Sequence, residues 1–354
     1  MIEGMSALTA EMVKAQAMSL GFDLCGICRP EAYPELGFLD EWLKLGYSGD
    51  MSYIGRTRRV RRDVRHILPS AQSVIVTATN YNTPRPYSTE IADPGVARIA
   101  RYAWGDDYHE VVLRRLNALW LWMRKTNPDP FEAMVYVDTG PIQERVYAQH
   151  AGIGWIGKHT CVISARRGSW IFLSTILCSL PLDPDPPATD HCGTCTKCLD
   201  ACPTGAIVEP YVLDARRCLS YLTIEQKKAI PDAHADAAGA YVYGCDICQD
   251  VCPWNQAPLV SSEPHWQPRP ALDAPRLVDL WRKSDAELAD ALTGSAMTRA
   301  PLTSLRRNLA IALGNATDQE TRAALDDAPD DARPTLRAPV VDAAIARGRR
   351  RRDG

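Results

Sequence analysis

The 354-residue sequence has no apolar stretch long enough to cross a bilayer. Its longest apolar stretch, Trp170 to Leu182, is shorter than the roughly 20 residues that a membrane-spanning helix needs. The opening residues MIEGMSALTAEM contain no basic segment followed by an apolar one, which a secretory signal would have. We therefore expect a cytoplasmic protein without membrane contact.

The sequence also lacks a strong excess of either charge. The formal net charge is −3, so overall charge does not draw the chain to nucleic acid. A polyanion would have to meet a local basic patch, although each candidate also fits an ordinary solvated face. The candidates are Arg56, Arg58, Arg59, Arg61, Arg62, Arg65, Arg216, Arg217, Arg306, Arg307 and a basic tail at residues 347–354, which we expect to be disordered.

Two further motifs are missing. No segment matches the phosphate-loop pattern G-x4-G-K-[ST]. The order C-x3-C-x2-C is also absent, which argues against a radical enzyme that uses adenosylmethionine. The sequence by itself asks for neither flavin nor nicotinamide, but it excludes neither of them.

Cysteine is plentiful, and twelve cysteines in a reducing compartment are more consistent with metal binding than with a disulfide scaffold. The segment HCGTCTKCLDACPTGAI, residues 191–207, follows C-x2-C-x2-C-x3-C-P, the pattern of bacterial 4Fe-4S ferredoxins. A second set follows further along the chain. The eight cysteines are Cys192, Cys195, Cys198, Cys202, Cys218, Cys245, Cys248 and Cys252.

In two-cluster ferredoxins the last cysteine of each run binds the cluster of the other run. This rule predicts one cluster on Cys192, Cys195, Cys198 and Cys252, and another on Cys202, Cys218, Cys245 and Cys248. A pair of structural zinc sites is the alternative, because C-x2-C pairs also form tetrahedral sulfur sites.

The remaining cysteines have a plainer interpretation. Cys25 and Cys28 form a C-x2-C pair with no partner cysteines nearby in the sequence, and Cys161 and Cys178 stand in apolar segments. We interpret all four as small buried hydrophobic residues.

Apolar periodicity predicts an α/β (α+β) fold for the first half of the chain, since strands and helices alternate there. The expected helices span 6–21, 107–125 and 141–151, and the expected strands span 73–81, 134–140 and 170–178. A proline-rich segment at 183–190 precedes the cysteines, and the Ala- and Leu-rich C-terminal part predicts helices, one of them at 302–316. The predicted domains are therefore 1–182, 183–257 and a small helical domain, 258–346, before the tail.

Four segments together resemble one enzyme family. They are ARYAWGDDYHEVV (100–112), VDTGPIQERVYAQHAGIGWIGKHT (137–160), CGTCTKCLDACPTGAIVEPYVLDARRCLSYLTIE (192–225) and YGCDICQDVCPWN (243–255). In this order they resemble the epoxyqueuosine reductases, which reduce the epoxide of a hypermodified wobble nucleoside in tRNA to queuosine. The resemblance spans roughly residues 15 to 315.

The resemblance implies two 4Fe-4S clusters and cobalamin, bound in an N-terminal domain similar to that of reductive dehalogenases. It further implies a ferredoxin-like cluster domain and a HEAT-like helical C-terminus. The cobalamin motif D-x-H-x-x-G is absent, since Asp107-Tyr108-His109 is not followed by the glycine. This absence fits a cobalamin without a lower histidine ligand.

The family pattern assigns roles to individual residues. Asp138 becomes the proton donor, which needs a raised pKa that burial against the cofactor would provide. Spacing alone offers a helix cap instead, because Asp138 precedes Pro141. The implied cobalamin contacts are Arg61, Ala100, Asp138, Val162, Leu173, Ser220 and Asp246, and the candidates for the substrate pocket are Arg145, Lys158 and His159. His159 also fits a core histidine with its hydrogen bonds satisfied.

Other functions stay open at this point. A reductive dehalogenase-like enzyme would use the same cofactors, although such enzymes usually carry an export signal. A ferredoxin-type electron carrier would not need the 180 or so residues that precede the cysteines. An RNA-binding module would use clusters or zinc only as structural staples. We expect a monomer that receives electrons from an external low-potential donor.

Overall fold

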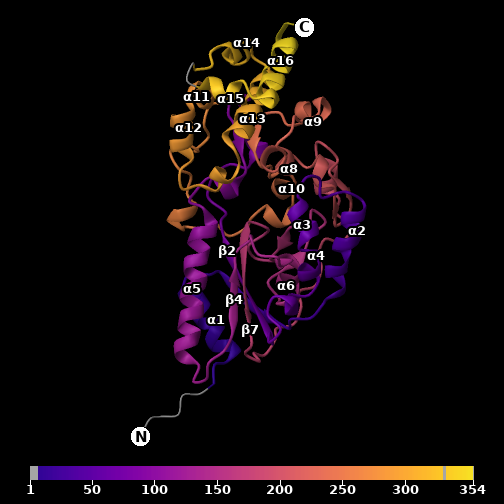
Figure 1. Ribbon diagram of the computed structural model, residues 1–354, viewed down its shortest axis with the longest axis vertical. Coiled ribbons are helices and arrows are strands. Elements are labelled where there is room, and N and C mark those ends of the chain that lie inside the picture. Colours follow the sequence, from indigo (N-terminus) through magenta and orange to yellow (C-terminus); the bar gives the residue numbers. More distant parts are fainter. Residues whose placement is uncertain (1–6, 330–331, 354) are drawn as a thin grey trace. The chain divides into compact units, whose positions relative to one another are not determined.

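The computed structural model describes residues 7–329 and 332–353, and in it the chain forms two compact units (Figure 1). The first unit comprises Met1–Asn82, Tyr108–Thr196 and Pro253–Ser262. The second comprises Thr83–Asp107, Lys197–Cys252 and Glu263–Gly354. The limits of these units differ from the domain boundaries that the sequence predicts at residues 182 and 257. The division into three domains therefore stays a prediction.

A four-stranded antiparallel sheet, ordered β1-β2-β7-β4, is the centre of the first unit. Strands β5 and β6, which lie between β4 and β7 in the sequence, form a separate two-stranded antiparallel sheet. The mixed α/β prediction is confirmed, with the sheet antiparallel throughout. The strands are β1 Leu24–Cys28, β2 Ser73–Asn80, β4 Ala133–Tyr136, β5 Trp155–Ile156, β6 Val162–Ile163 and β7 Ile171–Cys178.

Helices cover both faces of this sheet. Helix α6 packs on β2 and β7 from one side, whereas α5 contacts β4 and β7 and also contacts α1 (Figure 1). Every residue of β2 is therefore buried, as expected for a central strand covered on both faces. The helices are α1 Ala10–Ser19, α2 Phe38–Lys44, α3 Ser52–Arg56, α4 Arg58–Arg62, α5 Tyr108–Thr126 and α6 Glu144–His150.

The segments with the strongest apolar periodicity fold as predicted. Other helices and strands begin or end at residues that differ from the predicted ones. Strands β2 and β7 and helix α5 match their expected spans. Helix α1 is capped by the Thr9 hydroxyl, which accepts from the Met12 N–H; the expected start, Ser6, lies outside the described residues. Strand β4 ends at Tyr136 and α6 begins at Glu144, because the residues between them form a tight turn.

The second unit is mostly helical and has short strands. Strand β3 pairs in parallel with β10, and β8 pairs with β9. The strands are β3 Arg98–Ile99, β8 Ile207–Glu209, β9 Val212–Leu213 and β10 Tyr241–Tyr243. The helices are α7 Lys197–Ala201, α8 Leu219–Ile224, α9 Asp232–Ala237, α10 Ile247–Asp250, α11 Leu277–Arg282, α12 Asp285–Leu292, α13 Leu302–Asn315, α14 Gln319–Ala323, α15 Arg333–Leu336 and α16 Pro339–Asp353.

Helix α13 is the core element of the C-terminal helices, and it packs against α16, α11 and β10. Its residues from Ser304 to Gly314 are all buried. The helix expected at 302–316 is thereby confirmed. The finer expectation of a HEAT-like repeat remains a prediction.

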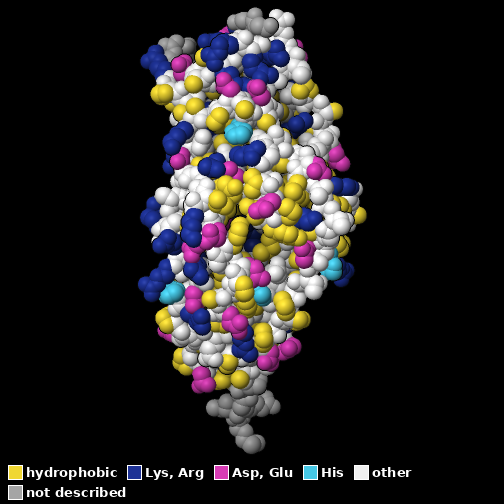
Figure 2. Space-filling view, turned by 90° about the vertical axis from the view of Figure 1, so that its right-hand side faces the viewer, with side chains coloured by type: hydrophobic (Ala, Val, Ile, Leu, Met, Phe, Trp, Pro, Cys, Tyr) yellow, Lys and Arg dark blue, Asp and Glu magenta, His cyan; other side chains and the backbone are white. Residues whose placement is uncertain are grey.

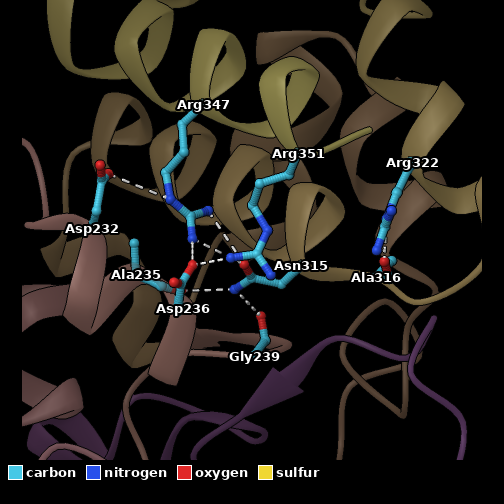
Figure 3. A network of polar contacts seen from close by, with 9 residues as sticks. All are labelled: Asp232, Ala235, Asp236, Gly239, Asn315, Ala316, Arg322, Arg347 and Arg351. Carbon is cyan, nitrogen blue, oxygen red and sulfur yellow. Dashed lines mark hydrogen bonds and ion pairs between the residues drawn. The ribbon is translucent and has the colours of Figure 1, made fainter. Parts of the chain in front are cut away.

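The expected disordered tail is wrong for residues 347–353, because they form the last turns of α16. Arg347 and Arg351 both pair with Asp236 at the end of α9, and Arg347 also donates to Asn315 Oδ1 at 3.2 Å (Figure 3). Asn315 in turn donates to the Ala235 carbonyl at 2.7 Å. Ion pairing to α9 orders a segment whose composition by itself predicted disorder.

Candidate active site

Asp138 lies in a tight turn between β4 and α6. Its φ of +56° is in the left-handed region, which costs a non-glycine residue of order 1 kcal/mol or more. The Thr139 N–H donates to the Val137 carbonyl at 2.6 Å, and Gly140 passes so close to the Tyr136 ring that an added Cβ would lie 2.4 Å from it. The turn pushes the Asp138 side chain outward, and 61% of it is exposed.

Three side chains surround Asp138 within the first unit. His109 Nε2, from the first turn of α5, lies 3.2 Å from Asp138 Oδ2. Glu144 Oε1 accepts the backbone N–H of Asp138, also at 3.2 Å. Arg61 is near enough for the charges of Asp138 and Glu144 to oppose the lowering of its pKa by burial. His109 and Glu144 thus contact Asp138 at an exposed turn, and Arg61 lies near enough for the charges of the two acids to act on it.

Glu144, partly buried at the start of α6, has a raised pKa. Burial raises its pKa to about 8, and the neighbouring charge of Asp138 adds to the effect. The helix-cap alternative for Asp138 is wrong, because α6 starts at Glu144 with Gln143 at its N-cap. Sequence reasoning missed both His109 and Glu144. His109 was visible only as part of an incomplete cobalamin motif, and Glu144 as one polar residue of the 137–160 segment.

The rest of the 137–160 segment folds against the start of α6. Arg145 is exposed and donates to the Thr160 carbonyl at 2.7 Å. His159 is 3% exposed, and burial lowers its pKa to about 4. Its Nδ1 accepts the Cys161 N–H at 3.2 Å, while its Nε2 is buried without a partner in the described part of the chain. Protein groups of the described chain thus satisfy only one of the two ring nitrogens of this buried histidine.

Unlike Arg145 and His159, Lys158 contacts the first cysteine loop. It is 8% exposed, and its Nζ donates to the carbonyls of Gly193 and Cys195, at 2.7 and 2.9 Å. Burial raises the pKa of the Cys192 thiol, and the Lys158 backbone N–H and the Trp155 indole oppose that rise. Lys158 therefore holds the first cysteine loop, so its predicted substrate contact stays a prediction without support from this geometry.

Cysteines predicted to hold the second cluster come together in the second unit. The charges of Cys218 and Cys202 both add to the rise that burial causes in the pKa of Cys245. Helix α7, which precedes Cys202, packs against α10, which contains Cys248. Within residues 7–329 and 332–353, no three His, Cys, Asp or Glu side chains form a site for a single metal ion. A cubane needs a wider set, since each cysteine binds a different iron.

The predicted cobalamin contacts fall into two groups, one in each unit. In the first unit Arg61 lies near Asp138, while Val162 and Leu173 belong to the apolar cluster around α6. In the second unit the Asp246 carboxylate accepts the Arg101 N–H at 2.6 Å, directly after buried Ala100. Ser220 is partly buried on α8. Their role in binding a cofactor stays a prediction.

Of the four remaining cysteines, all expected to be buried hydrophobic residues, Cys28 and Cys178 are buried and the other two are only partly buried. Cys28 and Cys178 are buried on β1 and β7, and burial raises the pKa of Cys178 to about 11. Cys25 and Cys161 are partly buried. Burial raises the pKa of Cys25 and Cys28 to about 12, so with Cys178 these thiols are not poised as thiolates.

The two arginine-rich patches differ in the structure. Arg56, Arg58 and Arg59 are exposed on α3 and α4. Arg306 and Arg307 are fully buried in α13 and donate to backbone carbonyls, so the expectation that they offer charge to a polyanion is wrong. On the face in Figure 2, Lys and Arg side chains form small groups with Asp and Glu between them.

Comparison with known proteins decides the family. Residues 61–139 match the model described as "Epoxyqueuosine reductase QueG, DUF1730", and residues 191–255 match a "4Fe-4S double cluster binding domain". The epoxyqueuosine reductase of Synechocystis sp. is 45% identical over 272 residues, which cover 76% of this chain and 92% of that protein. This chain belongs to the epoxyqueuosine reductase family.

Another relative and a solved structure agree. The enzyme of Gloeobacter violaceus is 42% identical over 90% of this chain and 99% of its own length. A crystal structure of epoxyqueuosine reductase with an epoxyqueuosine-modified tRNA stem loop superposes with a TM-score of 0.84 at 28% identity, over 97% of this chain and 98% of that one.

These matches confirm the family resemblance and the two-cluster interpretation of the cysteine pattern. The role of each cysteine and of each site residue stays a prediction. Among the described residues, no helix is both long and apolar enough to span a bilayer.

Proposed function

We propose that this chain reduces the epoxide of epoxyqueuosine in tRNA to queuosine, the last step in making that nucleoside. Electrons enter through two 4Fe-4S clusters, cobalamin is the final carrier, and Asp138 supplies a proton. The observation that supports this most directly is the Asp138 turn, whose exposed carboxyl meets His109 in a chain of this family.

The cysteines fit two clusters. The charge of Cys202 adds to the rise in the pKa of Cys218, and Cys202 and Cys218 both add to the rise in the pKa of Cys245, so the three thiols lie close together, as a cubane requires. We assign Cys248 to the same cluster, and Cys192, Cys195, Cys198 and Cys252 to the other, as the ferredoxin pattern predicts.

Several residues of the first unit also fit a bound cobalamin. His159 Nε2 is a buried acceptor or donor without a partner in the described chain, and a corrin ring bears amide groups that could satisfy it. Arg61 would hold an amide or the phosphate of the nucleotide tail, and Val162 and Leu173 would supply apolar contact. When bound, cobalamin supplies a low-valent cobalt that delivers electrons to the epoxide carbon.

Removing the epoxide oxygen requires two electrons and two protons, and the oxygen leaves as water. Asp138 would protonate the oxygen, and the exposure of its carboxyl on the turn supports this role. His109 orients this carboxyl at 3.2 Å, and Glu144 fixes the turn by accepting the Asp138 N–H. In the chain alone Asp138 is exposed, so the burial expected to raise its pKa would come from cofactor and substrate.

Asp138→Asn tests this assignment. We expect the variant to keep both clusters and cobalamin and to lose about 10²- to 10⁴-fold in turnover, the usual contribution of a general acid. The measurement is single-turnover reduction of epoxyqueuosine-tRNA by reconstituted protein, with iron and cobalt analysis of each sample. Thr139→Ser, one residue further along the turn, is the matched control. Near-normal turnover of Asp138→Asn would remove Asp138 from the mechanism.

The alternatives predict different outcomes in the same experiment. A ferredoxin-type carrier would retain iron but no corrin. A reductive dehalogenase-like enzyme would retain both and leave the tRNA unchanged. An RNA-binding module with structural zinc would contain neither iron nor corrin.

Several finer features belong to the same proposal. Exposed arginines of α3 and α4 would contact tRNA phosphates, and Arg145 would contact the substrate, as would His159 if it is not taken by the corrin. We further propose a cytoplasmic monomer with an external low-potential electron donor and a HEAT-like C-terminal domain. These features await gel filtration, donor assays and tRNA footprinting.

A further inference from the structure

Lys158 is a buried cation that lacks a carboxylate partner. Lys158 is only 8% exposed. No Asp or Glu of the described chain lies within ion-pair distance of its Nζ. A buried charge is expensive unless an opposite charge lies nearby. The structure therefore raises the question of which negative charge Lys158 compensates.

The recorded partners of the ammonium are two carbonyls of the first cysteine loop. Nζ donates to Gly193 at 2.7 Å and to Cys195 at 2.9 Å, so the cation is held against the loop that also contains Cys192. All of these residues belong to the first unit. Two neutral carbonyls orient the ammonium but do not neutralise it.

The residues next to Lys158 are also buried, whereas Gly193 and Thr194 of the loop itself are exposed. Trp155 is 3% exposed, and its ring meets Trp254 at 4.8 Å and His191 at 5.0 Å between centroids. The opposing charge on the loop is Asp190, which accepts the Cys192 N–H at 2.7 Å but is exposed. Solvent screens an exposed carboxylate far more than a buried ammonium.

We infer that Lys158 is the counter-charge of the first cluster, and that it raises the reduction potential of that cluster. The inference rests on the proposed function, since it takes the Cys192–Cys195 loop to bind a 4Fe-4S cluster. Four thiolates make such a cluster anionic, and reduction adds one more negative charge. A fixed, buried positive charge stabilises the reduced state more than the oxidised one. Lys158 is thus a positioning residue that favours electron entry.

The test separates charge from hydrogen bonding. Lys158→Gln keeps a donor without the charge, Lys158→Met removes both, and Lys158→Arg keeps both. Lys197→Gln is the matched control, because Lys197 is exposed and stands between two cluster cysteines in the sequence. Each protein is reconstituted anaerobically, analysed for iron, and titrated by electron paramagnetic resonance. The signal lost in Cys195→Ala identifies the first cluster.

We expect Lys158→Gln and Lys158→Met to lower the midpoint potential of the first cluster and to leave that of the second unchanged. Lys158→Arg should remain close to the unmodified protein, as should Lys197→Gln. If Gln and Met lose the first cluster while Arg retains it, a required charge is again supported. Unchanged potentials in Lys158→Gln would overturn the inference, as would loss of the cluster in the Arg variant too.

The unmodified protein distinguishes this result from a failure of the proposed function. Zinc in place of iron, or clusters without any tRNA turnover, would be evident before a variant is compared. With both clusters present, the Lys158 variants then test only the source of the potential.

Discussion

Two arginine-rich segments look alike in the sequence and have opposite roles in the structure. On α4, Arg58 and Arg59 are exposed, and no residue of the helix is buried. On α13, Arg306 and Arg307 are both 0% exposed. Arg307 donates to the carbonyls of Gln226, Lys228 and Leu222, at 2.6, 2.6 and 2.7 Å.

The difference shows what a buried guanidinium does. Its five N–H donors form a planar fork that can satisfy several carbonyls left over at helix ends and loops. Burial lowers the pKa of Arg307 to about 10, which leaves it charged at neutral pH. The same residue type therefore acts as an internal fastener in one segment and as surface charge in the other.

Substitution of the buried arginine should have the largest effect on the free energy of unfolding. Arg307→Met should lower the free energy of unfolding by about 3–5 kcal/mol, because three carbonyls lose their donor inside the core. Arg59→Met should change it by less than about 0.5 kcal/mol. Chemical denaturation of the two variants measures both values. If the two variants were equally stable, burial of the arginine would not explain a difference between the two segments.

Arg347 is the intermediate case, since it lies on the C-terminal helix and its side chain is 7% exposed. Arg347→Ala should cost about 1–3 kcal/mol, because Asn315 Oδ1 loses the Arg347 donor and Asp236 is left with Arg351 alone of the two arginines that pair with it (Figure 3). Arg350→Ala, at an exposed position of the same helix, is the control. Hydrogen exchange of α16 would report the loss locally, and equal protection in both variants would contradict it.

Two acids extend the comparison, because Glu144 is partly buried and lies six residues after exposed Asp138. The pKa of Glu144 is raised from 4.5 to about 8, so the folded state holds a proton that the unfolded state releases. Its contribution to stability is present below pH 4.5 and is lost as the pH rises to about 8.

Glu144→Gln mimics the protonated form and should flatten the pH dependence of stability between pH 4.5 and 8. Urea denaturation across that range measures the slope, with Glu31→Gln at an exposed position as the control. A slope identical to that of the unmodified protein would assign the proton to another group.

Substitutions of the exposed arginines on α4 should have the smallest effect on the stability of the protein. They should instead change its binding to tRNA. If α4 contacts tRNA phosphates, Arg59→Gln should reduce the slope of log affinity against log salt by about 0.7–0.9. Arg306→Gln should leave that slope unchanged where the protein stays folded. Filter binding at several salt concentrations distinguishes them, and a smaller slope for Arg306→Gln would contradict the comparison.

Much of the candidate site could be predicted from the sequence, because local spacing carries it. The C-x2-C-x2-C-x3-C-P run requires only neighbouring residues, and its double-cluster interpretation agrees with the family model at 191–255. Asp138 stood out through the segment that contains it. His109 and Glu144 did not, since a histidine on α5 reaches the turn only after the helix packs on the sheet.

The sequence by itself determined the central strand, the long helices and the cysteine pattern, because apolar periodicity and ligand spacing are properties of short segments. Only the tertiary structure decided which charges face water. It buried Arg306 and Arg307, ordered the basic C-terminal helix against Asp236, and turned Lys158 toward the cysteine loop. Those outcomes depend on carbonyls and carboxylates far away in the chain, and composition does not encode their positions.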